Sequence, residues 1–495
     1  MPATITDEFK RFLIDDVYSD FTNAGLDSSD PNLSRYYIAI GRTQPWEAPD
    51  SDTNPPTPTP SMLEELNFRE NIQSLKRCTD ASHVTLRYNW TNGNIYSGWN
   101  NKYHSNNIFL AGQPYEDPFY VMTNNNQVYV CIKQGVDGNG LPANSTVQPS
   151  NNSGDVFETT DGYQWKYMYT VGTADTQKYL TSGYLPCETV LDSTEGGPSI
   201  DDLDAFKQEQ LILQGEAIPG QIIGVDIEEG GSNFPDGVYP LEFSGVPLTG
   251  TAITDAYAWA TAIGGSIVNV SMKDPNALDT YYFGANYYNA TVAFTGGAAG
   301  DGAVLRPIIA QETGLGARPE IDLNSTALMF NVILEGAGGG DFIVDNDFRQ
   351  VGLMRNILAE DSDGAGNISI DILNTDTSLA LSSVEYNPAD VGATLDLDNI
   401  SGDNTMTGQT SGAVAIINAV RDGRFYYTQD RMTGYKSFVN GEPVDISDGG
   451  GSTTILSQTV TNIDKTSGQV FYIDYRRPFM RSLDQTEDIK IVIDF

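Results

Sequence analysis

The sequence contains few of the side chains that enzymes and metal sites use most. Two histidines, His83 and His104, and three cysteines occur among 495 residues. A catalytic triad or a histidine-based zinc site would need one of these histidines, which we interpret as ordinary surface or interface residues. Cys78, Cys131 and Cys187 are widely spaced and form no Cys-x-x-Cys pair. They therefore favour buried, reduced thiols over a disulfide framework or a zinc site.

Basic side chains are also scarce. The chain has 27 lysines and arginines against 66 aspartates and glutamates, which gives a formal net charge of -39. Such a field repels phosphate backbones and anionic membrane surfaces, so we expect neither a nucleic acid nor a membrane as partner. The excess of acid is most simply a means of keeping the protein in solution.

Long apolar runs are missing. No stretch approaches the roughly 20 residues that span a bilayer, and the first residues lack a basic region followed by an apolar one. A secretory signal is therefore not expected, and the protein should be cytosolic when it is made.

Motifs for catalysis or cofactor binding are not found. Residues 137–140 (Asp-Gly-Asn-Gly) and 345–347 (Asp-Asn-Asp) lack the spacing of a calcium loop, so we interpret them as turns. The glycine-rich residues 336–340 lack the Lys-Ser/Thr of a phosphate loop. Paired carboxylates are abundant, but no motif singles out a glycosidase pair. We expect no catalytic, cofactor-binding or metal site, and hence a protein that is not an enzyme.

Length and composition favour several β-rich domains. A chain of 495 residues exceeds the roughly 250–300 residues that one hydrophobic core supports, so we expect two to four domains. The 49 glycines and 26 tyrosines favour strands and turns over long helices. The expected fold class is mainly β, with a layered β-sandwich core, a few short helices and inserted small β modules.

Local patterns place the first elements. Apolar residues at helical spacing predict a helix over 7–21, with Thr6 or Asp7 as its cap, and a second, shorter helix over 199–213. Four prolines between 51 and 60 predict an extended loop. Short runs of β-forming residues predict strands at 35–40, 119–122, 128–132 and 165–171.

Two further regions have the pattern of small β modules. Residues 223–262 and 267–309 each contain a strand, a Gly-aromatic turn, a strand, a glycine turn and a strand. This repetition predicts two units that bury a face against each other. A second module is indicated between 365 and 468. The expected domains are 1–205 (core with N-terminal helix), 206–320 (repeat module), 321–364 (core), 365–467 (second module) and 468–495 (C-terminal core strand).

Aromatic residues cluster between Tyr88 and Tyr103, including Trp90, Tyr96 and Trp99. They could form a platform on which sugars stack. The simpler interpretation is that these rings pack on strands or at a subunit interface, where Tyr and Trp are enriched.

Four separated segments carry a more specific pattern. Residues 38–46 read Ile-Ala-Ile-Gly-Arg-Thr-Gln-Pro-Trp, and residues 161–167 read Asp-Gly-Tyr-Gln-Trp-Lys-Tyr. Residues 347–353 contain Phe-Arg-Gln, and residues 477–495 contain Arg-Pro, Asp-Gln-Thr-Glu and a terminal strand of alternating isoleucines. In this order the segments resemble the dimer-forming baseplate wedge subunit of T-even-like contractile-tailed bacteriophages.

The resemblance implies a function and a set of residues. The protein would be a structural baseplate wedge component in the virion tail, assembled in the host cytoplasm. It would act as a homodimeric scaffold that joins other wedge subunits. The interface candidates that these motifs supply are Gly41, Arg42, Pro45, Trp46, Asp161, Gly162, Tyr163, Trp165, Phe348, Arg349, Gln350, Arg477, Pro478, Asp484, Gln485, Thr486 and Glu487.

A peripheral carbohydrate-binding or depolymerising tail adhesin is the alternative, because of the repeats and the aromatic cluster. A scaffold should lie among other subunits. An adhesin should be peripheral, commonly trimeric, with a solvent-facing cleft of aromatic rings and carboxylates.

Overall fold

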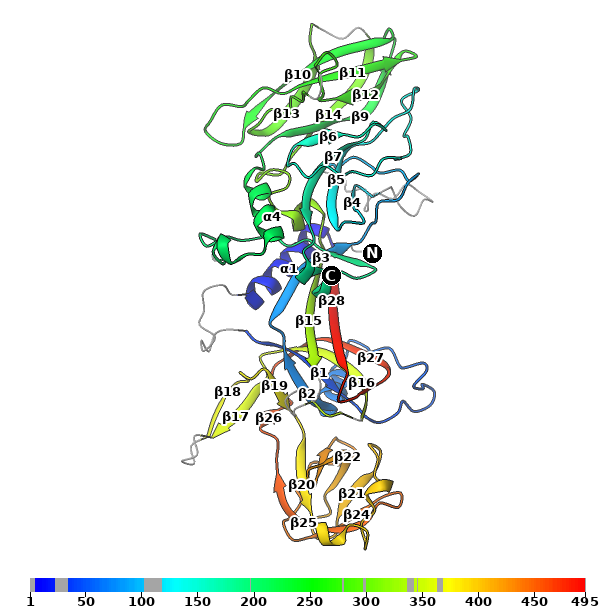
Figure 1. Cartoon of the computed structure of the whole chain (residues 1–495), viewed down its shortest axis with the longest axis vertical. Coiled ribbons are helices and arrows are strands. Elements are labelled where there is room, and N and C mark those ends of the chain that lie inside the picture. Colours follow the sequence, from blue (N-terminus) through cyan, green and yellow to red (C-terminus); the bar gives the residue numbers. More distant parts are fainter. Residues whose placement is uncertain are drawn as a thin grey trace. The chain divides into compact units, whose positions relative to one another are not determined.

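A computed structural model of the chain is mainly β, with 44% of residues in strands and 12% in helices, as the sequence predicts (Figure 1). The structure describes residues 5–22, 34–101, 118–195, 197–277, 280–296, 300–335, 342–344, 346–362 and 368–494. His104, Asp345 and the glycine-rich residues 336–340, which entered the sequence interpretation, lie outside this part.

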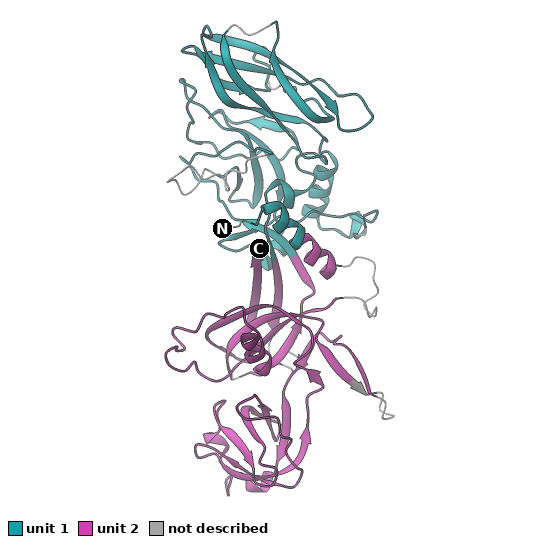
Figure 2. Ribbon diagram, turned by 180° about the vertical axis from the view of Figure 1, so that it is seen from behind, with its two compact units in different colours: residues 1–14, 82–328, 494–495 teal, residues 15–81, 329–493 magenta. Residues whose placement is uncertain are grey.

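The chain divides into two compact units, drawn in teal and magenta in Figure 2. Unit 1 comprises 1–14, 82–328 and 494–495, and unit 2 comprises 15–81 and 329–493. The range 1–205, expected as one part of the core, is therefore shared by both units. The chain passes between them within α1 (Asp7–Thr22), β3 (Asp80–Leu86), β15 (Ala327–Glu335) and β28 (Thr486–Asp494).

Helix α1 confirms the first predicted helix. The Thr6 hydroxyl accepts a hydrogen bond from the Phe9 N–H at 3.3 Å, so Thr6 caps the helix as expected. The second predicted helix begins later than expected. Residues Ile200–Asp202 form a 3-10 turn (η2), and α4 spans Ala205–Gly215, because the Asp204 carboxylate accepts hydrogen bonds from two N–H groups of its first turn.

The first sheet of unit 1 has the strand order β4-β5-β7-β6. It confirms the strands predicted near 119–122, 128–132 and 165–171, and its aromatic side chains form buried clusters. Its elements and the flanking short ones are β4 (Tyr120–Met122), β5 (Gln127–Lys133), β6 (Val156–Glu158), β7 (Gln164–Thr170), α3 (Thr173–Lys178), β8 (Tyr184–Pro186) and α5 (Pro319–Asp322). Tyr96 and Trp99 are buried here, which confirms that these rings pack in the fold.

The repeat region of unit 1 forms a four-stranded and a two-stranded sheet around one core. The strands are β9 (Ile222–Ser232), β10 (Gly237–Pro247), β11 (Tyr257–Ile263), β12 (Ser266–Ser271), β13 (Tyr287–Phe294) and β14 (Asp301–Ile309). Their orders are β12-β11-β10-β13 and β14-β9. Equivalent turn residues share a left-handed backbone: Asn233 has φ 63° and Asn286 has φ 68°. The repeat in the sequence is thus a repeat in the structure.

A five-stranded antiparallel sheet, with the order β19-β2-β1-β16-β27, is the centre of unit 2. Ile38 on β1 lies opposite Leu353 on β16, and Val351 lies opposite Asp474 on β27. The elements are β1 (Tyr36–Gly41), α2 (Met62–Glu70), β2 (Ile72–Arg77), β16 (Asn346–Arg355), β19 (Thr377–Leu379) and β27 (Gln469–Arg481). Strands β15 and β28 are neighbours in a separate sheet.

Two smaller parts complete unit 2. A closed barrel with the order β20-β23-β22-β21-β24-β25 occupies the predicted second module. A hairpin of β17 and β18, with β26 on the other side of β17, extends away from the five-stranded sheet (Figure 1). The bounds are β17 (Leu358–Ser362), β18 (Ile368–Ile372), β20 (Ser382–Tyr386), η4 (Pro388–Asp390), η5 (Leu397–Asn399), β21 (Thr405–Gly408), β22 (Val414–Arg421), β23 (Arg424–Thr428), β24 (Pro443–Ile446), β25 (Gly451–Thr459) and β26 (Ile463–Asp464).

Two smaller expectations, on the cysteines and on His83, can be compared with this fold. The three cysteines are free and buried, as predicted. His83 is only 6% exposed on β3, so its interpretation as a surface residue was wrong. In the Asp-Gln-Thr-Glu segment at 484–487, Thr486 and Glu487 already belong to β28.

Candidate functional site

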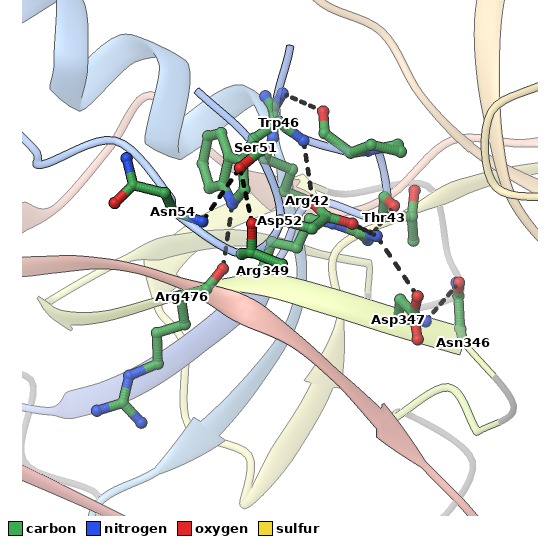
Figure 3. Close-up of polar contacts among 12 residues, drawn as sticks. Arg42, Thr43, Trp46, Ser51, Asp52, Asn54, Asn346, Asp347, Arg349 and Arg476 are labelled. Atoms are coloured by element: carbon green, nitrogen blue, oxygen red, sulfur yellow. Dashed lines mark hydrogen bonds and ion pairs between the residues drawn. The ribbon is translucent and has the colours of Figure 1, made fainter. Parts of the chain in front are cut away.

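A bidentate salt bridge between Arg349 and Asp52 forms where the first and third motifs meet in unit 2. Arg349 of β16 donates from Nε to Asp52 Oδ1 at 2.8 Å and from Nη2 to Asp52 Oδ2 at 2.7 Å (Figure 3). Arg349 is 4% exposed, and its third nitrogen donates to the Thr43 carbonyl. This forked pairing is the geometry in which arginine binds a carboxylate most strongly.

The pairing changes the acidity of both groups. Hydrogen bonds from Arg349 lower the pKa of Asp52 to about 2. Burial opposes the charge of Arg349, but the hydrogen bonds and negative charge of Asp52 outweigh this, so the pKa of Arg349 is raised. Both groups are therefore charged at neutral pH, and the loop that carries Asp52 is tied to the central sheet.

Arg42 and Trp46 form the corner of the first motif. Arg42 has a left-handed backbone with φ 57°, and its guanidinium lies over the Trp46 ring, 4.1 Å from the centroid. The Trp46 indole N–H donates to the Arg476 carbonyl at 3.1 Å, and its ring contacts Tyr475 with centroids 4.7 Å apart. Arg42 also donates to the Pro45 carbonyl. The corner therefore attaches to β27, the strand that leads into the fourth motif.

Gly41, Phe348 and Gln350 of these two motifs are buried in unit 2. A Cβ on Gly41 would lie 2.0 Å from the Asn71 carbonyl oxygen, so only glycine fits where β1 passes β2. Gln350 donates from its side chain to the Phe68 carbonyl at 2.7 Å. Phe348 is fully buried, and its ring contacts Phe479. These side chains specify how β1, β16 and α2 fit together.

Polar contacts also connect the motif region to the barrel within unit 2. Thr43 donates to the Gly402 carbonyl at 3.2 Å and accepts from the Asn418 amide at 3.2 Å. Asn346 donates to the Asn418 carbonyl and accepts from the Asp347 N–H. The loop after β1 thus links the central sheet to β22.

The fourth motif separates into a buried and an exposed part. Arg481 is fully buried at the end of β27 and donates to Glu487 at 2.9 Å. Arg477, Asp484, Gln485 and Thr486 are exposed, and Pro478 is half-buried. Of the predicted interface candidates, these four residues and Pro45 are exposed to solvent.

The second motif lies in unit 1, whereas the first and third motifs and residues 477–493 of the fourth lie in unit 2. Asp161 accepts hydrogen bonds from the Thr146 N–H at 2.7 Å and the Val147 N–H at 2.9 Å. Burial raises the pKa of Asp161, but hydrogen bonds, from the Thr159 hydroxyl first, lower it below its usual value overall. Gly162 has φ 84°, a conformation that favours glycine. Tyr163 and Trp165 are fully buried and stacked. This motif forms a turn and an aromatic core.

Sequence reasoning missed Asp52, the partner of Arg349. It lies in the proline-rich loop, which was interpreted only as extended chain, and no local spacing connects it to a residue almost 300 positions away. It also missed α2, where Met62 and Leu63 are 88% and 58% exposed. A single sequence does not indicate which of its apolar residues are exposed and which are buried.

In the ranges that the structure describes, no three histidine, cysteine or acidic side chains are grouped so that they could hold a metal ion. The residues 137–140 form the expected turn, with Asp137 accepting hydrogen bonds from the N–H groups of Asn139 and Leu141. No helix among the described residues is long and apolar enough to cross a membrane.

Compared with known proteins, the chain matches no family model and no curated protein.

Proposed function

We propose that the chain is a structural subunit of a contractile phage tail baseplate, a dimeric scaffold that joins neighbouring wedge subunits. The ordered resemblance of the four motifs supports this proposal. Three of the motifs contribute to one region of unit 2, through β1, β16 and β27. Their buried side chains hold turns and pack strands, which suits a protein whose work is to keep surfaces in a fixed geometry.

The observation that carries the proposal is the apolar edge of the β17–β18 hairpin. Ile368 and Ile370 on β18 are 68% and 61% exposed. Among the described strands, β18 is hydrogen-bonded to β17 alone. Folded proteins usually protect such an edge with charge, a bulge or a covering segment, because it pairs readily with another chain. Burying each isoleucine in a subunit contact would contribute about 1.5–3 kcal/mol.

The pattern of β18 fits a second copy of the same strand. Its sequence, Ile-Ser-Ile-Asp-Ile, has the same apolar positions in both directions. Antiparallel pairing of two copies about Ile370 would place Ile368 opposite Ile372 of the other copy, with all isoleucines on one face. A twofold contact of this kind is self-complementary, as the commonest homodimers are.

Sedimentation velocity of the full chain tests the dimer. The wild type should sediment as a dimer at micromolar concentration, and Ile370→Lys should shift it to the monomer. Leu456→Lys is the matched control, because Leu456 is also exposed, at 46%, but lies on the closed barrel. A monomeric wild type, or an Ile370→Lys variant that remains dimeric, would reject β18 as the dimer contact.

Location in the particle tests the scaffold role itself. Immunogold labelling of purified tailed particles that contain the chain should mark the baseplate. Labelling of fibre tips, together with a trimer in sedimentation, would instead support the peripheral adhesin.

A further inference from the structure

We infer that the repeat module of unit 1 carries a binding site for a neutral glycan on the outer face of β11. Three aromatic rings meet there at the protein surface. Tyr257 and Trp259 are two positions apart on β11, so they share a face, and Tyr282 stands beside both. The ring centroids of Tyr257 and Tyr282, and of Trp259 and Tyr282, are 5.9 Å apart in each pair.

These rings are open to solvent, unlike the rings of the Tyr88–Tyr103 cluster. Tyr257 and Tyr282 are 43% and 38% exposed, and Trp259 is half-buried. The alternating residues of β11, Ala258 and Ala260, are buried and supply the core contacts of the strand. The aromatic face is therefore not needed to fill the core of the module.

The polar ends of the rings have no partner in the described part of the chain. No protein group in this part forms a hydrogen bond with the Trp259 indole N–H or with the hydroxyls of Tyr257 and Tyr282. Buried tyrosines elsewhere do use their hydroxyls, as Tyr163 does toward the Ala143 carbonyl at 2.6 Å. Exposed rings with available donors match a ligand that offers both an apolar face and hydroxyl groups.

The neighbouring strands place further hydrogen-bonding groups around the rings. Glu242 on β10 lies opposite Tyr257, and Ser271 on β12 lies opposite Trp259. Cross-strand partners share a face of the sheet, so a carboxylate and a hydroxyl flank the rings. A pyranose presents C–H bonds on its flat face and hydroxyls around its rim, and this face could bind both.

The second half of the module shows that the fold does not require these aromatic residues. The register pairs Arg306 of β14 with Asp226 of β9, in the position equivalent to Trp259 with Ser271. There the equivalent position holds an arginine, whose largely buried side chain forms an ion pair with Asp226 at 2.7 Å. The same strand geometry thus accepts a charged side chain, and the aromatic face is a property of one half alone.

Charge restricts the class of glycan. The net charge of -39 and the Glu242 carboxylate on this face repel sulfated or uronic acid polymers. The ligand should therefore be a neutral polymer of hexopyranoses.

Isothermal titration of the full chain tests this site, with cellohexaose, chitohexaose, maltohexaose and galactomannan as probes and heparin as the anionic control. At least one neutral glycan should bind, and Trp259→Ala should weaken that binding at least tenfold. Tyr288→Ala is the matched control, since Tyr288 is 62% exposed on the same module but outside the three rings, and it should bind like the wild type.

Other outcomes overturn the inference. It fails if none of the neutral glycans binds, if only heparin binds, or if Trp259→Ala binds as tightly as the wild type. If Trp259→Ala does not fold, Tyr257→Ala and Tyr282→Ala provide the same comparison. If these variants change self-association and not glycan binding, the face is a protein contact and no glycan site exists there. The site is independent of the scaffold proposal, whose tests concern β18.

Discussion

Asp52 in unit 2 and Asp322 in unit 1 are both acidic side chains held by hydrogen bonds, but only Asp52 faces an arginine. The two hydrogen bonds from Arg349 lower the pKa of Asp52 to about 2. Asp322 is 1% exposed and accepts from the Gly316 N–H at 2.7 Å, and burial raises its pKa to about 7. Unit 2 is thus stabilised by the charged form of its acid, and unit 1 by the neutral form.

Acid should therefore affect the two sites in opposite directions. The pKa of Asp52 is lower in the folded chain than in the unfolded chain. The ionised carboxylate therefore stabilises the folded state at pH values above the unfolded pKa, and this stability is lost as the pH falls toward about 2. The raised pKa of Asp322 means that the folded state binds more protons than the unfolded state between the ordinary value of 3.8 and about 7. The stability of unit 1 at this site should fall as the pH rises through that window.

The largest effect that we expect is this pH dependence in unit 1. The full pKa difference at Asp322 corresponds to about 4 kcal/mol, as an upper limit. Asp322→Asn should remove this contribution, because the amide stays neutral and still offers an oxygen to the Gly316 N–H. Urea unfolding at about pH 5 and about pH 8, followed by hydrogen exchange of unit 1 peptides, measures the difference.

The Asp322→Asn variant also controls for the effect of pH on the rest of the protein. Acidification reduces the repulsion among all 66 acidic residues, so only the difference between the wild type and Asp322→Asn reports on this site. Equal pH dependence in both proteins would contradict a neutral Asp322.

The next effect concerns the ion pair of unit 2. Arg349→Met leaves the half-buried Asp52 carboxylate without its partner, which should destabilise the unit by about 3 kcal/mol, the upper end for hydrogen bonds to a charged group. Urea unfolding with hydrogen exchange of β1 and β16 peptides measures this loss. Adding Asp52→Leu should restore part of the stability, since no uncompensated charge remains. If the double variant is less stable than the single one, the pair is not the source of the loss.

The sequence was sufficient for many elements of this fold. The periodicity of residues 7–21 predicted α1, and the repeat of Gly-aromatic turns predicted the six strands of the repeat module. These features are local, because they depend on spacing along one segment. The mainly β class follows from composition for the same reason.

Long-range pairing could not be predicted from single segments. Asp52 and Arg349 meet only because β1 and β16 are neighbours, and nothing in the proline-rich loop indicates that partner. The exposure of aromatic rings could not be predicted from single segments either. Tyr96 and Trp99 are buried, whereas Trp259 is not, although all three lie in aromatic-rich stretches. Periodicity gives the face of a strand, but the neighbouring strands decide whether that face is covered.

Asp161 of the second motif can be compared with Asp52. Asp161, like Asp52, has a lowered pKa, but its donors are neutral N–H and hydroxyl groups. Asp161→Ala should therefore cost less than Arg349→Met, about 2 kcal/mol for hydrogen bonds to one charged group. Asp161→Asn is the control, since it keeps one oxygen and should lose less. Thermal unfolding monitored by near-ultraviolet dichroism of the buried Tyr163 and Trp165 measures both.

The smallest effect separates two reasons for glycine in the motifs. Gly162 has φ 84°, and no neighbouring atom lies closer than 3.9 Å to the position of an added Cβ, so its constraint is conformational. Gly162→Ala should cost about 1 kcal/mol, and Gly162→Asn less, because asparagine tolerates the left-handed region better. Gly41 is constrained by space instead, since its Cβ would overlap the Asn71 carbonyl. Gly41→Ala and Gly41→Asn should therefore both destabilise unit 2, with no benefit from asparagine. Urea unfolding of the four variants tests this, and a rescue of Gly41 by asparagine would show that its backbone conformation, and not the close approach of β2, requires glycine.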